Sequence, residues 1–212
     1  MNNPYNQEAI QIYVGEKRSG KSLSMVADTY DLTKNLKIKP IIYSNMHLDI
    51  KYFPTFKLIT LQELEGFYKN KEDFKKCIFL IDEGHTFLDA RKFMKKGNMQ
   101  IGYLVGQMGK RGNIMLINTH FPRFLDIRIR LYCEKWIYVS KLIRNSTGQL
   151  TVLKNYNEEL TKEQNNNLYI FCEPVIRKLI GFDFINTPLP SYILKANKYF
   201  HLYDTEEMIT PE

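Results

Sequence analysis

A phosphate-binding sequence lies near the start of the chain. Residues 15–22 read GEKRSGKS, which matches the pattern G-x-x-x-x-G-K-[S/T] between an apolar run and a helix-like stretch. The glycines let the backbone curl so that successive N–H groups point at phosphate oxygens, and the following helix turns its positive end to the same anion. We expect Lys21 to reach the β- and γ-phosphates of a nucleoside triphosphate such as ATP, and the Ser22 hydroxyl to bind Mg²⁺. The residues expected to bind nucleotide are Gly15, Glu16, Lys17, Arg18, Ser19, Gly20, Lys21 and Ser22.

Two adjacent carboxylates supply the second half of the expected site. An apolar run ends in Asp82 and Glu83, which places both at the carboxyl edge of a buried strand, where open α/β sheets bind their ligands. We expect Asp82 to hold Mg²⁺ together with Ser22. Glu83 is expected to take a proton from a water molecule that attacks the γ-phosphate. The alternative for Glu83 is a helix cap, and a protein that only binds nucleotide would not need a base there.

Polar residues also end the next apolar run of the sequence. Asn118 or Thr119 is expected to hydrogen-bond the attacking water or the γ-phosphate, with simple turn chemistry before Pro122 as the alternative. The residues alone do not choose between these two. The histidines are interpreted as ordinary surface or loop residues, because none has a second ligand at metal spacing. They are His47, His85, His120 and His201.

The net charge of +7 is concentrated in one stretch of the sequence. Residues 85–131 contain nine basic side chains against two acidic ones, and the rest of the chain is balanced at 21 of each. A basic field next to a nucleotide site indicates a polyanionic partner such as nucleic acid, with a solvated basic surface as the alternative. Four of these basic residues directly follow the Asp-Glu strand and are candidate contacts to DNA phosphates, although a solvated charge run is an equal rival. They are Arg91, Lys92, Lys95 and Lys96.

An arginine finger is a further candidate within the basic stretch. Arg111 lies in a short basic connection between two glycines, where it could reach the γ-phosphate of a neighbouring subunit and stabilise charge in the transition state. A basic helix end that complements the helix dipole is the alternative. Arg128 and Arg130 compete for the same role, although Arg130 could instead pair with Asp126 at i, i+4 spacing if this stretch is helical.

Alternating apolar runs and helix-length segments predict the elements that position these residues. The pattern favours an α/β fold with a largely parallel sheet flanked by helices on both faces. The expected strands cover residues 10–14, 41–44, 56–59, 77–81 and 114–118, and the expected helices cover 21–35, 98–109 and a segment opened by a Thr60–Glu63 capping box. Residues 135–144 and 149–154 flank a turn-rich tetrapeptide and predict a β-hairpin, after which 168–175 resume strand character. The C-terminal third is therefore expected to add antiparallel strands to the same sheet, within one domain that spans residues 1–212.

Composition excludes several other classes of protein. No apolar run approaches the roughly 18 residues of a membrane span, and the polar N-terminus lacks a signal region, so we expect a protein that is neither membrane-embedded nor secreted. The three cysteines, Cys77, Cys133 and Cys172, are far apart and predict neither a disulfide framework nor a zinc site. We expect them to be buried free thiols.

Together these motifs resemble the FtsK/HerA superfamily of P-loop ATPases. The resemblance rests on residues 15–22, 82–85, 107–119 and 198–205. Within the superfamily, the compact chain is similar to the genome-packaging ATPases of icosahedral viruses with an internal membrane, especially the turreted viruses of archaea. Many relatives end the strand after the Asp-Glu pair in Gln, whereas this sequence has Asn118 and Thr119 there.

The resemblance implies a RecA-like fold, hydrolysis of ATP with Mg²⁺ at subunit interfaces, and translocation of double-stranded DNA through a hexameric or pentameric homo-oligomeric ring. It favours Arg111 as the trans-acting finger. It also implies a capsid, portal or membrane protein of a virion as docking partner, and a location in the host cytoplasm or the virion.

Two other interpretations compete with a packaging motor. Residues 82–91 are also similar to the zonula-occludens-toxin-like assembly ATPases of filamentous phages, which generally carry a membrane anchor. A P-loop kinase for a small metabolite is a different class, but a kinase has little use for Glu83 as a base that activates water and usually needs an arginine-rich lid. A non-catalytic nucleotide-binding scaffold fits least, because loop, Mg²⁺ carboxylate and base are all present.

Overall fold

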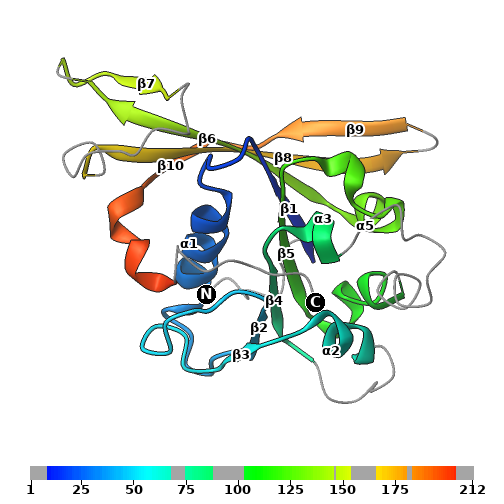
Figure 1. Cartoon of the computed structure of the whole chain (residues 1–212). Helices are drawn as coiled ribbons and strands as arrows, with labels where there is room; N and C mark the ends of the chain where they lie inside the picture. The colour runs from blue at the N-terminus through cyan, green and yellow to red at the C-terminus, as the bar shows by residue number, and fades with distance from the viewer. Residues whose placement is uncertain are drawn as a thin grey trace.

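The structure is a computed structural model, and it describes residues 9–67, 75–87, 103–145, 147–153, 166–180 and 183–203. Ten strands in these residues form one mixed sheet in the order β10-β8-β6-β1-β5-β4-β2-β3, with β7 paired to β6 and β9 paired to β8 (Figure 1). The strands are β1 Ile10–Val14, β2 Ile42–Ser44, β3 Phe56–Leu58, β4 Ile78–Ile81, β5 Ile114–Thr119, β6 Lys135–Arg144, β7 Leu150–Val152, β8 Leu168–Ile180, β9 Asp183–Pro188 and β10 Tyr192–Lys195.

Helices cover both faces of the parallel half of the sheet. Figure 1 shows α1 on one face and the shorter α2, α3 and α5 on the other. The helices are α1 Lys21–Thr33, α2 Leu61–Gly66, α3 Gly84–Phe87, α5 Ile127–Tyr132 and the 3-10 turns η3 Gly109–Arg111, η4 Pro122–Phe124, η5 Ala196–Lys198 and η6 Phe200–Leu202. None of the helices in the described ranges is both long and apolar enough to cross a membrane.

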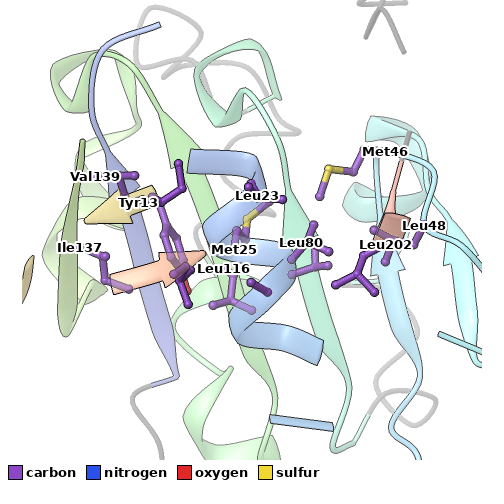
Figure 2. Close-up of a cluster of buried hydrophobic side chains, with 14 of the residues drawn as sticks. Tyr13, Leu23, Met25, Met46, Leu48, Leu80, Leu116, Ile137, Val139 and Leu202 are labelled. Carbon is purple, nitrogen blue, oxygen red and sulfur yellow. The ribbon is translucent and has the colours of Figure 1, made fainter. Parts of the chain in front are cut away.

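The parallel strands are continuous apolar runs because both of their faces are buried. Tyr13 of β1 packs with α1, and the preceding Ile12 packs into the cluster on the opposite face, although neither residue is exposed. Figure 2 shows the cluster beside α1, where Leu23 and Met25 of the helix meet Leu116 of β5. This two-sided core fixes the carboxyl ends of β1, β4 and β5 at one edge of the sheet.

The C-terminal part extends the sheet with antiparallel strands, as the sequence predicts. The predicted hairpin is β6 and β7, with Leu142 opposite Val152, and β8 pairs with β6 along nine residues. Strand β8 runs further than the predicted end at residue 175 and passes through Pro174. Proline is tolerated there because β8 changes its outer neighbour at that point, from β10, paired up to Cys172, to β9, paired from Val175 onward. Strands β9 and β10 are additions that the sequence pattern did not predict.

The predicted elements of the parallel half are present with small differences in their ends. Strand β1 has the predicted bounds, and Thr60 and Glu63 form the predicted capping box at α2. The helix predicted over residues 98–109 lies partly outside the described residues, and in the remainder only 103–105 are helical. Turns and η3 replace its end, because Gly109 and Gly112, the latter at φ 65°, favour chain reversal over helix.

Candidate active site

The predicted phosphate-binding loop connects β1 to the start of α1. Gly20 caps the helix with φ 97°, a left-handed conformation that favours glycine. At Gly15 an added Cβ would lie 2.3 Å from the backbone oxygen of Val139, so the loop passes too close to β6 for any side chain. The local sequence therefore produces the tight curl that a phosphate cradle requires.

The groups inside this loop are suited to an anion. Lys21 is only 4% exposed, and its ammonium donates to the backbone oxygen of Glu16 at 2.7 Å. Burial lowers the pKa of Lys21 to about 8, although the nearby carboxylates Glu83 and Asp82 oppose the shift. The Ser19 hydroxyl is buried and has no hydrogen-bond partner among the described residues. A buried cation and an unpaired hydroxyl beside a curled backbone fit the oxygens of a nucleotide phosphate.

The two predicted Mg²⁺ ligands meet at the sheet edge. The Ser22 hydroxyl donates to Oδ1 of Asp82 at 2.7 Å, although the two residues are far apart in sequence. Burial raises the pKa of Asp82, and the hydrogen bonds from Ser22 and Asn118 act in the opposite direction. A hydroxyl and a carboxylate are the hard oxygen donors that Mg²⁺ prefers, and this ion usually completes its shell with water and substrate phosphates. Both residues therefore fit the ion that the sequence predicts.

The predicted base, Glu83, lies beside this pair and is held by histidine. Nε2 of His120 lies 2.9 Å from Oε1 of Glu83, and Nδ1 of His120 lies 2.8 Å from the Lys21 ammonium. Because an ammonium only donates, Nδ1 of a neutral His120 must accept from Lys21, and Nε2 then carries the proton donated to Glu83. His120 thus connects the lysine of the phosphate loop with the carboxylate expected to activate water.

The electrostatics keep Glu83 ionised. Burial would raise the pKa of Glu83, but the hydrogen bond from His120 and the nearby charge of Lys21 outweigh it and lower the pKa. Nδ1 of His85 lies 3.3 Å from Oε2 of Glu83, within range of a charge interaction, but makes no hydrogen bond to any described residue. The interpretation of His120 as an ordinary loop histidine is therefore wrong, since its side chain is 16% exposed and bridges two site residues. Its position directly after Asn118 and Thr119 is the feature of the sequence that could have revealed it.

The backbone of Glu83 is also held in an unusual conformation. Glu83 has φ 50°, a left-handed value that costs a residue with a side chain of order 1 kcal/mol. Its N–H donates to Oδ1 of Asn118 at 2.9 Å, and its carbonyl accepts from both the N–H and the hydroxyl of Thr86. These bonds fix the direction in which the carboxylate leaves the strand.

Of the two candidates at the end of β5, only Asn118 contacts the expected catalytic residues. Its amide nitrogen donates to the Ser22 hydroxyl at 3.0 Å and to Asp82, and its oxygen accepts from Glu83. Thr119 is equally buried, but among the described residues its hydroxyl accepts only from the Phe121 N–H at 3.3 Å, which is a turn contact. Asn118 therefore connects both expected Mg²⁺ ligands, Ser22 and Asp82, with the expected base, Glu83.

One supporting residue has no counterpart among the sequence predictions. Asn45 follows β2, and its side chain exchanges two hydrogen bonds with the backbone of Asp82, at 2.7 Å to the N–H and 2.9 Å to the carbonyl. An asparagine just after a strand ordinarily indicates a turn, so only the neighbouring position of β2 and β4 in the sheet reveals its role. It holds Asp82 in register with Ser22.

Arg111 lies at the amino ends of the parallel strands, whereas the site lies at their carboxyl ends. It ends η3, just before β5, and its carbonyl accepts from the N–H of Lys76, just before β4. The length of β5, roughly 20 Å, separates it from Lys21 of the same chain. Its guanidinium donates to the side chain of Gln107 at 2.9 Å. Arg111 therefore cannot contact a phosphate bound in its own chain.

The competing arginines are engaged within α5. Asp126 caps this helix and pairs with the guanidinium of Arg128 at 2.6 Å, while Nε of Arg130 donates to the Leu125 carbonyl. The alternative i, i+4 pair between Asp126 and Arg130 does not form, because the cap position turns the carboxylate toward Arg128 instead. The four candidate DNA contacts lie outside the described residues. They are Arg91, Lys92, Lys95 and Lys96.

Comparison with known proteins rests on structure alone. No protein-family model and no curated protein matches the sequence. The structure is similar to the N-terminal domain of zonular occludens toxin from Neisseria meningitidis, with 15% identity, a TM-score of 0.53, and coverage of 92% of this chain and 98% of that chain. It is also similar to the genome packaging NTPase of Sulfolobus turreted icosahedral virus 2 in complex with ATP-gammaS, with 12% identity, a TM-score of 0.51, and coverage of 88% and 98%.

The DNA-packaging ATPase of Sulfolobus turreted icosahedral virus gives a third match, with 15% identity, a TM-score of 0.50, and coverage of 86% of this chain and 98% of that chain. At sequence identities this low, the structural similarities show a shared fold alone. Together with the mixed sheet and the loop between β1 and α1, they establish that this chain has the RecA-like P-loop NTPase fold and resembles packaging-type ATPases.

Proposed function

We propose that this protein is a Mg²⁺-dependent ATP hydrolase that translocates double-stranded DNA, and that it acts as a genome-packaging motor. The observation that supports hydrolysis is that three segments meet at one site: the phosphate-binding loop, the Asp82-Glu83 strand end and the end of β5. Ser22 and Asp82 lie in contact at 2.7 Å, and Glu83 beside them is linked through His120 to Lys21. A site that only held nucleotide would not need an ionised, firmly positioned carboxylate next to its metal ligands.

The residues divide the chemistry among themselves. Lys21 moves from His120 to the β- and γ-phosphates of ATP, which are stronger partners for an ammonium than a neutral imidazole. A Mg²⁺ ion held by Ser22 and Asp82 would neutralise charge on the same phosphates. Glu83 then orients a water molecule and accepts its proton, while Asn118 keeps Glu83 and the metal ligands in fixed relation.

A neighbouring subunit is expected to complete the site. Arg111 is the favoured trans-acting finger, and its position at the far edge of the sheet is compatible only with a phosphate in another subunit. Such an arrangement requires a homo-oligomer in which each subunit reaches the site of its neighbour, and the hexameric or pentameric ring of the FtsK/HerA proteins that the motifs resemble would meet this requirement in every subunit. Mixed assemblies test this step, since Arg111→Ala subunits should restore activity to Glu83→Gln subunits only if arginine and base act across an interface. If mixtures stay inactive while Arg128 or Arg130 variants complement, the finger is a different arginine.

DNA as the partner rests on charge and on the fold. The excess of nine basic over two acidic residues lies between positions 85 and 131, next to the Asp-Glu strand. Two of the solved structures that share the fold are packaging ATPases of turreted icosahedral viruses. For this chain we infer the same task, with a capsid, portal or membrane protein of the virion as docking partner and a location in the host cytoplasm or the virion.

A second candidate is a filamentous-phage-type assembly or export ATPase. The fold similarity to the zonular occludens toxin domain favours it, because its TM-score of 0.53 and coverage are at least as high as those of the packaging proteins. The two candidates share the nucleotide chemistry and differ in the partner that stimulates it.

Steady-state hydrolysis of ATP, measured with and without double-stranded DNA, separates these functions. A packaging motor should hydrolyse ATP with Mg²⁺ and accelerate several-fold on DNA, with the stimulation falling as salt rises, because phosphate contacts release counterions. Hydrolysis that ignores DNA would support the assembly ATPase. Phosphoryl transfer to a small acceptor in place of water would support a kinase and overturn the proposal.

A further inference from the structure

Lys141 of β6 lies beside the phosphate-binding loop and has no part in the site described above. Strand β6 runs parallel to β1 and continues past its end, since Val14 pairs with Tyr138 and the backbone oxygen of Val139 approaches Gly15. Lys141 follows shortly after and pairs with Ile170 of β8. Strand β6 therefore passes directly behind the loop at this point.

The side chain of Lys141 is on the same face of the sheet as the loop. Ile137 and Val139 point toward α1, as Figure 2 shows, and alternation along the strand places Lys141 on that face as well. Its partner Ile170 confirms the direction, because the methyl end of Ile170 would lie 2.4 Å from a Cβ added at Gly20. Lys141 thus extends toward the loop and the first turn of α1.

The surroundings of Lys141 are unfavourable for a cation in the absence of an anion. The residue is half-buried, and across the described ranges no carboxylate lies within ion-pair distance of its ammonium. Burial and the positive charge of Arg18 lower its pKa, and Lys141 in turn lowers the pKa of Lys21. Three cations thus influence one another around a loop shaped for phosphate, and a bound anion would relieve their repulsion.

We propose that Lys141 is a further nucleotide-binding residue, and that it contacts the end of the phosphate chain opposite the γ-phosphate. This inference rests on the proposed nucleotide-binding function. The choice of phosphate follows from the sheet order, in which β1 lies between β5 and β6. On the β5 side of β1, Asn118 and His120 contact Glu83, so the γ-phosphate that is hydrolysed would lie on this side. Lys141 lies on the other side of β1, where the α-phosphate and its sugar ester would enter.

Lys141 and Lys21 recognise different parts of the nucleotide. A contact to the α-phosphate is present in both ADP and ATP, so its loss weakens both nucleotides by the same factor. It plays no part in the attack on the γ-phosphate, so turnover at saturating ATP is retained. A lysine that only shields the loop or packs against Ile170 would affect folding and leave nucleotide affinity unchanged.

Titration calorimetry with ADP and with a non-hydrolysable ATP analogue tests this, using Lys141→Met, which keeps the length of the side chain and removes its charge. We expect both affinities to fall by the same factor, about tenfold or more, and Lys141→Arg to recover most of the loss. Lys178→Met is the matched control, since it removes the same charge from an exposed position on the neighbouring strand β8. It should bind as the unmodified protein does.

Thermal unfolding without nucleotide supplies a second readout. Because Lys141→Met removes a half-buried charge that faces other cations, the melting temperature should stay the same or rise while nucleotide affinity falls. Unchanged ADP affinity in Lys141→Met would overturn the inference and leave the proposed function intact. A loss confined to the ATP analogue would overturn it too, because it would move the contact to the γ-phosphate. If the unmodified protein binds neither nucleotide, the proposed function fails as well.

Discussion

Replacing Asn118 by alanine should remove the hydrogen bonds that connect the expected Mg²⁺ ligands with the expected base of the active site. The side chain is fully buried at the end of β5, where it donates to Ser22 and Asp82 and accepts from the N–H of Glu83. Alanine leaves the Glu83 N–H without an acceptor and removes one of the two side-chain donors to Asp82. A buried group left without its partner costs about 1–3 kcal/mol, so we expect the free energy of unfolding to fall by about 2–3 kcal/mol.

The same substitution should reduce catalysis. Residues that orient metal ligands typically contribute about 10–100-fold to metal affinity or activity, and Asn118 touches both expected Mg²⁺ ligands as well as the backbone of the base. The assays are urea denaturation without nucleotide and initial rates of ATP hydrolysis across a Mg²⁺ titration. A higher Mg²⁺ requirement together with a lower maximal rate is the expected result.

Thr119→Val is the matched control for Asn118→Ala. Thr119 is equally buried and directly adjacent, but within the part of the chain that the structure describes its hydroxyl makes only the 3.3 Å turn contact with the Phe121 N–H. Valine keeps its shape, so we expect a loss of stability below about 1.5 kcal/mol and nearly normal Mg²⁺ dependence. Equal effects of the two substitutions, or a larger effect at Thr119, would refute the assignment of Asn118 as the connecting residue.

Two further predictions concern the phosphate-binding loop. Gly15→Ala should abolish nucleotide binding and lower the melting temperature, because its Cβ would lie 2.3 Å from the Val139 backbone oxygen, whereas Gly66→Ala, with no atom within 4 Å, should leave both unchanged. Binding of ADP should take up a proton at alkaline pH, because phosphate restores the charge of Lys21, whose pKa is about 8 in the free protein. Calorimetry in two buffers of different ionisation enthalpy should give uptake of about three quarters of a proton near pH 8.5 and about a tenth near pH 7. Equal binding heats in both buffers near pH 8.5 would contradict proton uptake by Lys21.

Local sequence was sufficient for the parts of the fold that depend on one element at a time. The loop at residues 15–22, strand β1 and the capping box at Thr60 each follow from residues adjacent in the chain. The hairpin of β6 and β7 likewise follows from a turn between two apolar runs. These features need no knowledge of what packs against them.

Features that depend on contacts between distant elements were not predictable in the same way. His120 belongs to the site only because β5 lies next to β1, which brings its ring between Lys21 and Glu83. Asn45 holds Asp82 because β2 is the neighbour of β4. The pairing of Asp126 with Arg128 depends on where α5 begins. In each case the residue type allowed several partners, and the packing of the sheet selected one.

The central claim is that Glu83 activates water for hydrolysis of ATP in a site built by Lys21, Ser22 and Asp82. The most direct measurement compares ATP binding and Mg²⁺-dependent turnover in the unmodified protein and in Glu83→Gln, which keeps the size of the side chain and removes the base. We expect the variant to bind ATP normally and its turnover to fall by about 10²–10⁴-fold. Turnover equal to that of the unmodified protein would show that Glu83 is not the base.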